Sequence, residues 1–409
     1  MPAFTDSASK GYPGTLVYSR ISGSHLDVSL ASFAYPHHSG EVRAELAKLL
    51  TGAGTLDNGF VLSTCLRILV AVPGPQPALD DALHALFGDL SDHIQPQIRQ
   101  GDRAVTRLFR VAAGLESPIL GEHEILTQFR RTVLEAEEAE AVEGLFARLL
   151  ETAVSVGRRT RDLLPGSPHK SMGAVAAQAI GSASRVAVLG SGIMATAVVE
   201  GLLLLPIPPH ITVVARHPEK VASRDGLEVW AFDRAAEALA TFPAVVSATS
   251  AKQHLVDDET MAAAVSEREA PLTLVDMAMP PDFRSPEALA ITYLDIDDLA
   301  RMADNRPRAG EADSYVEAAA SDAYRQYRDH DTVGPLIGGL MRTADDIVDR
   351  TVDRFAGRLG SGDDEGVLRQ AAHTVARTLL AGPVAYVKQA DRAPEAVDVI
   401  AEAFGVDDE

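Results

Sequence analysis

The sequence predicts a multidomain α/β protein, and three observations lead to that fold class. The chain has 409 residues with 46% hydrophobic content, which exceeds what one ordinary core needs. Short β-type runs alternate with helical stretches over residues 185–298, a pattern typical of a parallel, doubly wound sheet. After residue 306 the strand signals end and an amphipathic helical pattern follows. We therefore expect two or three domains.

The N-terminal third mixes strand and helix signals. Apolar runs at residues 14–21 and 59–72 predict strands, and residues 42–50 between them have a helical pattern. A long helical run at residues 125–164, rich in alanine and glutamate, looks like a connector. Residues 164–170 contain two prolines and a glycine, which is typical of a hinge. These segments predict a small α+β domain followed by a second domain.

The predicted parallel sheet and the helical tail follow in order. The expected strands are residues 186–189, 211–215, 244–248, 272–276 and 292–295. In the tail, apolar residues recur at helical spacing over residues 333–355 and 367–380, on either side of a turn at residues 360–364. This pattern predicts a helical hairpin with a broad apolar stripe. Such a stripe favours a second copy in a dimer, with packing against the chain's own N-terminal domains as the alternative.

Composition excludes several classes of function. With 37 Lys+Arg against 58 Asp+Glu the net charge is −21, so any nucleic-acid contact needs a local basic patch. The best local basic cluster is Arg158, Arg159, Arg161 and Lys170, to which Arg130 and Arg131 can add, although i,i+4 pairing with the many glutamates is the simpler account of these residues. The one cysteine, Cys65, rules out an internal disulfide or a multi-cysteine zinc site, and we expect no metal. We find no apolar run typical of a signal peptide or a membrane span, so we expect a cytoplasmic protein.

A glycine-rich turn follows the first strand of the predicted parallel sheet and opens a helix. Its residues are Gly190, Ser191, Gly192, Ile193, Met194 and Ala195. The first glycine makes the turn, and the second lets a pyrophosphate approach the N–H groups of the helix N-terminus. Arg216, after the next strand, suits a 2′-phosphate, which favours NADP(H) over NAD(H). The alternative for Arg216 is a solvated position at a helix start.

Cys65 follows an apolar strand, between Thr64 and Arg67. A lone cysteine is more often a small buried hydrophobic residue than a nucleophile. Arg67, however, offers a fixed cation that can hold a carboxylate or favour the thiolate, and Thr64 adds a hydroxyl. These neighbours make Cys65 a candidate nucleophile.

A second polar cluster occupies residues 114–128, where two glycines bracket a turn into a helix. From this turn Ser117, Glu122, Glu124 and Gln128 can project polar groups toward one concave site. The alternative is a capped helix start with a solvated acidic first turn, and composition leaves both open.

In this combination and order the motifs resemble those of glutamyl-tRNA reductase. The resemblance is carried by Ser63-Thr64-Cys65-x-Arg67, Gly114-Leu115-Glu116-Ser117 with Leu120-Gly121-Glu122, the turn from Gly190, Leu274-Val275-Asp276-Met277-Ala278-Met279-Pro280, Asp297-Asp298-Leu299, and Pro383-Val384 with Lys388-Gln389 in the tail. Each motif alone is weak, but together they extend over nearly the whole chain. The chain is therefore identified as a member of that family.

The resemblance implies three domains. These are an N-terminal catalytic domain at residues 1–165, an NADPH-binding Rossmann-like domain at residues 166–305, and a long connecting helix with an all-α dimerisation domain at residues 306–409. The implied reaction is the NADPH-dependent reduction of glutamyl-tRNA to glutamate-1-semialdehyde, the first step of 5-aminolevulinate and tetrapyrrole biosynthesis. The implied assembly is a homodimer without a membrane partner, and a glutamate-1-semialdehyde aminomutase is a candidate partner.

The resemblance also implies roles for single residues. Cys65 is the nucleophile that takes the glutamyl group as a thioester, which is easier to reduce than an ester. The residues that hold the substrate are Thr64, Cys65, Leu66, Arg67, Ser117, Glu122, His123, Glu124 and Gln128. The turn at residues 190–195, together with Arg216, holds the cofactor.

The chain departs from the family pattern near the expected site. The departures are Leu66 for asparagine, Leu69 for glutamate, Arg107 for histidine, Glu124 for glutamine and Pro281 for arginine. Arginine cannot shuttle a proton as histidine can, but its fixed charge can depress the pKa of the Cys65 thiol. These departures leave a second interpretation open, in which a catalytically silent relative binds tRNA or a partner enzyme and regulates the pathway.

Overall fold

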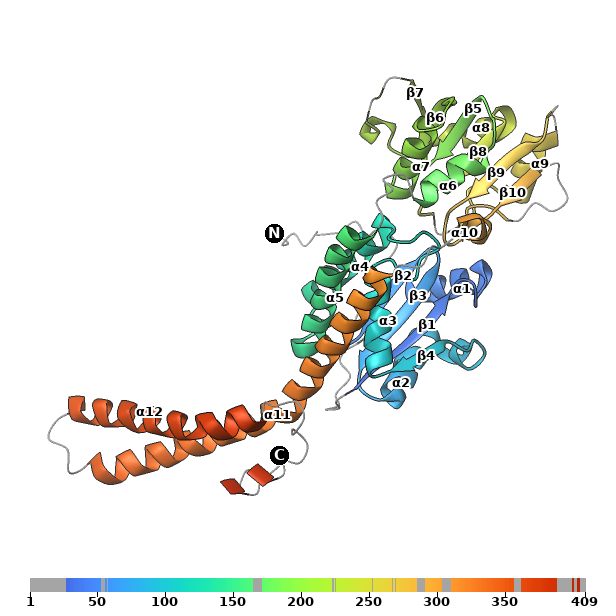
Figure 1. Ribbon diagram of the computed structural model, residues 1–409. Coiled ribbons are helices and arrows are strands. Elements are labelled where there is room, and N and C mark those ends of the chain that lie inside the picture. The colour runs from blue at the N-terminus through green and yellow to red at the C-terminus, as the bar shows by residue number, and fades with distance from the viewer. Residues whose placement is uncertain are drawn as a thin grey trace, which may run out of the picture. The chain divides into compact units, whose positions relative to one another are not determined.

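The computed structural model divides the chain into two compact units, residues 1–320 and residues 321–409 (Figure 1). The described residues are 27–52, 56, 58–164, 171–222, 224, 226–251, 253–266, 268, 270–284, 291–303, 310–356, 362–387, 399–400 and 403–404. The strand expected at residues 14–21 and most of the expected hinge, residues 165–170, lie outside these ranges. Within the described ranges, none of the helices has the length and apolar content that spanning a bilayer would take.

The N-terminal part is built on a four-stranded antiparallel sheet. In the order β2-β3-β1-β4, its strands are β2 (Phe60–Thr64), β3 (Arg67–Pro73), β1 (Val28–Ala34) and β4 (Gln97–Gln100). Residues 59–72 contain strand as predicted, and the structure divides them into β2 and β3, which form a hairpin with Thr64 opposite Arg67 at its turn. Strand β1 was not predicted because serines interrupt its apolar pattern. It is nevertheless buried throughout, and Ser29 there donates a hydrogen bond of 2.8 Å to the carbonyl of Gly74.

Helices cover both faces of this sheet (Figure 1). One face packs against α1 (Gly40–Leu50) and α2 (Gln76–Phe87), which leads into the 3₁₀ turn η1 (Gly88–Asp92). The other face packs against α3 (Asp102–Ala112) and α4 (His123–Glu138), and α5 (Gly144–Leu163) packs against these two helices.

The expected connector at residues 125–164 is wrong, because this run forms the two packed helices α4 and α5. The chain turns between them at Glu140, which has a φ of 54°. Phe129 of α4 lies 4.9 Å from Phe60 of the sheet, measured between ring centroids. On α5, a Cβ added to Gly157 would lie 2.7 Å from the carbonyl oxygen of Ala112. Helical periodicity predicted the helices correctly, but it does not say which surface covers the apolar face.

The second sheet is parallel throughout and confirms the doubly wound prediction. In the order β10-β9-β8-β5-β6-β7, its strands are β10 (Ile291–Leu294), β9 (Leu272–Asp276), β8 (Ala244–Ser247), β5 (Arg185–Leu189), β6 (His210–Ala215) and β7 (Leu227–Ala231). The order reverses between β5 and β8, which places a ligand crevice at the carboxyl ends of these strands. Strand β7 was not predicted because it lies at the sheet edge, where Trp230 is its one buried residue.

Helices lie on both faces of the parallel sheet as well. One face packs against α6 (Met172–Ala179), α7 (Ile193–Leu203) and α10 (Ile296–Ala303), and the other against α8 (Ala235–Thr241) and α9 (Asp258–Ser266). The short turns η2 (Pro218–Lys220) and η3 (Phe232–Arg234) flank β7. The first of these apolar layers also contains Leu66 and Ile119 from the N-terminal part, so one core joins the two sheets.

The remaining helices are α11 (Glu311–Ala356) and α12 (Gly362–Val387). Arg369 of α12 forms ion pairs with Asp349 and Asp353 of α11, and His373 lies 2.9 Å from Asp345. These contacts confirm the predicted helical hairpin. Large apolar side chains remain exposed on it, including Val367 at 68% and Leu379 at 72%. Such exposure is typical of a surface that a partner covers.

Candidate active site

Cys65 lies in the tight turn of the β2–β3 hairpin and is half-buried. The hydroxyl of Thr64 closes this turn, because Oγ1 accepts a 3.2 Å hydrogen bond from the Arg67 N–H and donates one of 3.3 Å to the Arg67 carbonyl. The Leu66 carbonyl accepts a hydrogen bond of 3.0 Å from the N–H of Tyr35. The structure therefore gives Thr64 the role of presenting Cys65.

Arg67 begins β3 beside Cys65 and is buried, with 4% of its surface exposed. Its Nη2 donates a hydrogen bond of 2.8 Å to the carbonyl of Glu116. Its Nη1 has no partner among the described residues. Burial, followed by the charge of Arg107, lowers the pKa of Arg67 to about 10. A ligand carboxylate would supply the acceptor that this nitrogen lacks.

Two carboxyl groups lie near the thiol, at the start of α4. Glu122 is buried and is hydrogen-bonded to the Ser117 side chain, to the backbone of Met172 and to Glu124. Burial raises the pKa of Glu122 to about 7, and burial together with the charge of Glu122 raises the pKa of Glu124 to about 8. Two hydrogen-bonded carboxyls share a proton and keep one negative charge, which a bound cation can neutralise.

The thiol is held in its protonated form when no ligand is present. Burial, followed by the charges of Glu122 and Glu124, raises the pKa of Cys65 to about 12, while Arg43 and Arg67 act in the opposite direction. Arg67 favours the thiolate as expected, but burial and the carboxylates outweigh its effect on the thiol pKa. Neutralising both carboxylates would remove two of the three causes that raise the pKa of the thiol, and only burial would remain.

Arg107 lies on α3 and pairs with Glu116 rather than with the thiol. Its Nη1 is 2.9 Å from Glu116 Oε2, and Arg110 Nε is 2.8 Å from Oε1 of the same carboxylate. Arg110 also reaches Asp313 of α11 at 2.8 Å. Burial alone would raise the pKa of Glu116, but Arg107 and Arg110 hold it below its usual value. The cations that lower the thiol pKa most are Arg43 and Arg67, so a direct action of Arg107 stays a prediction.

The other predicted substrate residues are placed as follows. Leu66 packs its side chain into the apolar cluster of the parallel sheet, which leaves only its backbone to face a ligand. His123 begins α4, and its side chain lies outside the described part of the chain. Gln128 is half-buried one helical turn after Glu124, on the same face of α4. The structure thus brings together Cys65 and the side chains of Arg67, Ser117, Glu122 and Glu124.

The predicted cofactor turn has the shape that a pyrophosphate needs. Gly190 has a φ of 115°, and a Cβ there would lie 2.6 Å from the carbonyl oxygen of Ala248, so only glycine fits. A Cβ at Gly192 would meet nothing within 4 Å. Helix α7 has no side-chain N-cap, so its first N–H groups can bind an anion. Ile193 beside them is 61% exposed, as expected for an apolar residue that a ligand covers.

Arg216 follows β6 and is exposed, with its guanidinium carbon 5.9 Å from the ring centroid of Phe232. Burial raises the pKa of Asp282, and the charge of Arg216 is among the effects that act in the opposite direction. An exposed guanidinium stacked near an aromatic ring at the end of this strand fits the predicted 2′-phosphate contact. The residues present therefore fit NADPH.

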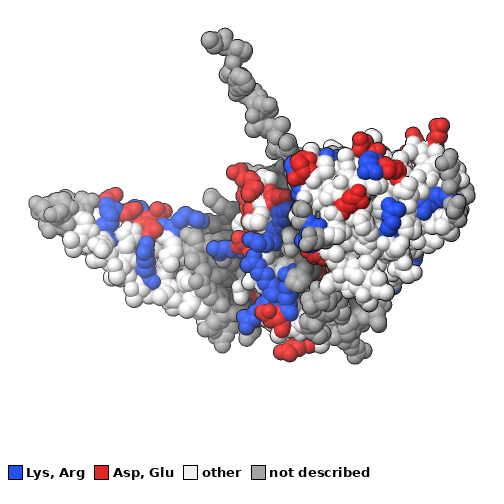
Figure 2. Space-filling model, turned by 90° about the horizontal axis from the view of Figure 1, so that it is seen from above, with Lys and Arg blue, Asp and Glu red and all other residues white. Residues whose placement is uncertain are grey.

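The predicted basic cluster is on the surface. Arg158 and Arg159 are exposed on α5, and the Arg159 guanidinium carbon lies 5.9 Å from the ring centroid of Tyr315. In the view of Figure 2, Lys and Arg side chains gather in one band with acidic side chains beside them. Arg131 pairs with Glu135 at 3.5 Å, as the alternative account expects. Contact with tRNA phosphates stays a prediction.

Comparisons with known proteins agree with these features. Residues 21–163 match the model of the glutamyl-tRNA reductase N-terminal domain, residues 174–302 that of shikimate/quinate 5-dehydrogenase, and residues 311–406 that of the glutamyl-tRNA reductase dimerisation domain. The glutamyl-tRNA reductase of Thermus thermophilus is 33% identical over 302 residues, 67% of this chain and 73% of that one. The chain belongs to the glutamyl-tRNA reductase family.

Other family members match over more of the chain. The glutamyl-tRNA reductase of Shouchella clausii is 30% identical over 380 residues, which cover 86% of this chain and 83% of that one. The solved structure of the glutamyl-tRNA reductase from Methanopyrus kandleri is 24% identical, covers 93% of this chain and 99% of that chain, and has a TM-score of 0.47. The predicted family resemblance is confirmed, and the exact domain limits stay a prediction.

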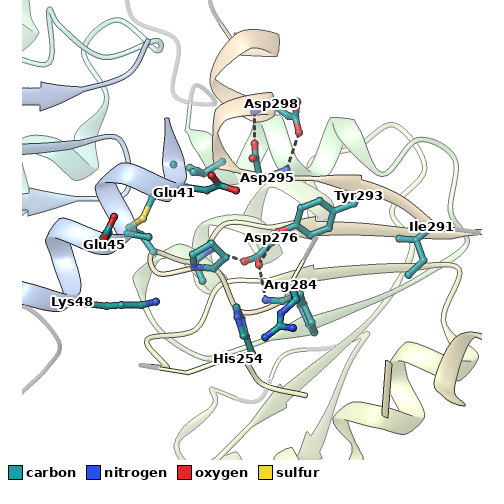
Figure 3. Close-up of a pocket in the computed structure, with 17 residues that line it drawn as sticks. Glu41, Glu45, Lys48, His254, Asp276, Arg284, Ile291, Tyr293, Asp295 and Asp298 are labelled. Atoms are coloured by element: carbon teal, nitrogen blue, oxygen red, sulfur yellow. Dashed lines mark hydrogen bonds between the residues drawn. The ribbon is translucent and has the colours of Figure 1, made fainter. Parts of the chain in front are cut away.

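Sequence reasoning missed part of this family member's nucleotide domain. A cavity of about 890 Å³ lies between α1 and the carboxyl ends of β9 and β10, and Pro281 is among its lining residues. Figure 3 shows Asp276 and Tyr293 on this cavity, and the Tyr293 hydroxyl donates a hydrogen bond of 3.2 Å to Asp276. Asp276 also accepts bonds from the N–H groups of Ala278 and Phe283, so its carboxylate is satisfied by its own loop. In the sequence, the signal that could have pointed to Asp276 was its position at the end of a buried strand.

Proposed function

We propose that this protein reduces glutamyl-tRNA to glutamate-1-semialdehyde with NADPH, by way of a thioester on Cys65. The observation that carries the proposal is the set of charges beside the thiol. A buried guanidinium with an unpartnered nitrogen and a carboxyl pair that shares a proton both lie near one cysteine. An amino acid with a free α-ammonium and a side-chain carboxylate complements both groups. Membership in the family supports the same substrate.

The substrate's own charges activate the nucleophile. Arg67 takes the side-chain carboxylate of the glutamyl group through its free Nη1. Glu122 and Glu124 take the α-ammonium while they keep their shared proton, so its positive charge neutralises the one negative charge of the pair. Because these two carboxylates are among the causes that raise the Cys65 pKa, that pKa falls when the substrate binds.

Acyl transfer then needs only residues of the N-terminal part. The Cys65 sulfur attacks the carbonyl carbon of the ester, the bond from that carbon to the ribose oxygen of the tRNA breaks, and the thiol proton leaves with the ribose hydroxyl. The resulting thioester is more electrophilic than the ester, which divides one difficult step into two easier ones.

The cofactor crevice adjoins the thiol. When bound, NADPH supplies the hydride that the thioester carbonyl carbon accepts. The residues that would hold it are those of the turn at residues 190–195 and Arg216. Cys65 packs against the apolar cluster that contains Ala195, Ala248 and Met277, all at the carboxyl edge of the parallel sheet. This packing supports delivery of the thioester to the cofactor.

We also propose a cytoplasmic homodimer that uses the exposed apolar side chains of α11 and α12. The single cysteine, kept as a free thiol, fits a reducing compartment. The match of residues 311–406 to a dimerisation domain supports the assembly. Docking of a glutamate-1-semialdehyde aminomutase stays a prediction.

The test is incubation of the protein with glutamyl-tRNA and NADPH, with semialdehyde formation as the readout. The wild type is expected to form semialdehyde, and Cys65→Ser is expected to form none while still binding glutamyl-tRNA. Retained binding shows that the variant is folded. A wild type that binds glutamyl-tRNA without forming semialdehyde would instead identify the catalytically silent relative.

A further inference from the structure

Arg43 on α1 is fully buried and connects the Cys65 turn to the nucleotide domain. Its Nε donates a hydrogen bond of 3.3 Å to the carbonyl of Cys65, and its Nη1 donates one to the carbonyl of His38. Its Nη2 forms an ion pair with Oδ1 of Asp297 on α10. The other oxygen of Asp297 accepts a hydrogen bond of 2.8 Å from the N–H of Gly40. Each guanidinium nitrogen therefore has a partner.

This arrangement holds three separate segments in one geometry. A guanidinium is planar and donates in fixed directions, so it orients its acceptors more strictly than an ammonium does. The ion pair is shielded from salt, since the side chain of Arg43 is 0% exposed and that of Asp297 is 14% exposed.

Arg43 lies beside the contact between the N-terminal part and the nucleotide domain. This contact lies between the thiol and the cofactor crevice. Leu66 and Ile119 of the N-terminal part are buried in the same cluster as Ala195 and Ala248 of the nucleotide domain. The cavity in Figure 3 borders this contact, with Glu41 of α1 on one side and Asp298 of α10 on the other. Loss of the ion pair would weaken the polar attachment of α10 to α1 beside this apolar contact.

We propose that Arg43 is a positioning residue for the reduction step: through Asp297 it holds the nucleotide domain against the turn that carries Cys65. The inference rests on the proposed function. Acyl transfer uses residues of the N-terminal part alone, whereas reduction needs both domains in contact. Without the bridge, water reaches the thioester, adds to its carbonyl carbon and releases free glutamate, and the thiol is regenerated.

The experiment compares Arg43→Lys and Asp297→Asn with the control Asp298→Asn. Lysine keeps the charge that lowers the Cys65 pKa but cannot reach all three acceptors. Asp298 lies on the same helix, where its carboxylate caps the N–H of Asp295 and pairs with Arg301, so its substitution tests for general weakening of α10. Single-turnover reactions with glutamyl-tRNA and NADPH report the ratio of semialdehyde to free glutamate, together with the rate at which Cys65 is acylated.

We expect the ratio to fall about 10- to 100-fold in Arg43→Lys and Asp297→Asn while the acylation rate is maintained. The control is expected to keep the wild-type ratio. A purely structural role would slow acylation and reduction together and leave the ratio unchanged, which would overturn the inference. If the wild type itself forms no semialdehyde, the proposed function fails instead, so the two failures are distinguishable.

Amide hydrogen exchange without cofactor gives an independent readout. The Gly40 N–H is bonded to Asp297, so we expect it and its neighbours in α1 to exchange faster in Asp297→Asn and in Arg43→Lys than in the wild type. In Asp298→Asn, faster exchange is expected only in α10. Equal protection of α1 in all four proteins would show that the bridge does not hold the domains together, and the inference would be wrong.

Discussion

Two arginines, both buried, flank the Cys65 turn, and their surroundings differ in one respect. Around Arg43, groups of the protein satisfy all the guanidinium nitrogens. Around Arg67, Nη2 has a carbonyl partner but Nη1 has none among the described residues. A satisfied buried guanidinium fixes structure, whereas an unsatisfied one has a cost that a ligand carboxylate can offset. The bonding partners, rather than residue type or burial, therefore separate positions that build the site from those that bind the substrate.

Arg67→Met tests the difference between the two arginines with the largest expected effect. The variant loses the charge that pairs with the substrate carboxylate, so kcat/KM for semialdehyde formation is expected to fall about 100- to 1,000-fold. Its free energy of unfolding is expected to stay the same or rise, because a buried and incompletely paired charge has been removed. Steady-state kinetics and urea unfolding measure the two quantities. A large loss of stability would mean that Arg67 builds the site as Arg43 does.

Arg43→Met tests the other side of the comparison. It leaves the half-buried Asp297 carboxylate without its cation and two carbonyls without their Arg43 donor, so the free energy of unfolding is expected to fall by about 3–5 kcal/mol. Urea unfolding measures the loss. Adding Asp297→Leu to the variant is expected to recover part of it, because no unpaired charge remains. If the double variant is less stable than the single one, the Asp297 carboxylate is not the source of the loss.

Two glycines of the cofactor turn also differ in this way, since one is needed for the fold and the other for binding the ligand. Gly190→Ala forces a Cβ against the Ala248 carbonyl at a positive φ, so we expect a loss of about 2 kcal/mol or more in unfolding free energy. Gly192→Ala meets open space and is expected to change stability by about 0.5 kcal/mol or less. It is nevertheless expected to weaken NADPH binding about tenfold, because its methyl group occupies the path of the pyrophosphate. Unfolding curves and a cofactor fluorescence titration measure these effects, and unchanged NADPH affinity in Gly192→Ala would remove this glycine from the binding positions.

The smallest expected effect is a pH dependence of stability. The pKa of Glu124 is about 8 in the folded chain against an ordinary 4.5, so the folded state holds this proton more tightly than the unfolded state. Its contribution to stability is complete below pH 4.5 and is lost as the pH rises through about 8. Glu124→Gln cannot ionise, and we expect it to lessen the decline between pH 6 and 9 by on the order of 1 kcal/mol. Unfolding at several pH values measures this decline. Asp276→Asn is the comparison variant, which is also expected to lessen the decline but to leave substrate binding unchanged. An identical decline in the wild type and Glu124→Gln would argue against a shared proton.

The misses in prediction have physical causes. Strand β1 has serines within its apolar run, and β7 is an edge strand, so neither gives the signal of a fully buried strand. The run at residues 125–164 showed the right period, but only packing decides that α4 covers the sheet and that α5 packs against α3 and α4. The cavity beside Asp276 involves α1 and a loop more than 200 residues later, which no local pattern connects.

By itself the sequence determined the parallel sheet, the glycine turn at Gly190 and the adjacency of Cys65 and Arg67, because each depends on residues close together along the chain. Only the tertiary structure decided how these residues are bonded. Arg43 and Asp297 are 254 positions apart, and the thiol pKa is raised by burial and by carboxylates from another segment. Desolvation and ion pairing depend on distance in space, which residue order does not specify.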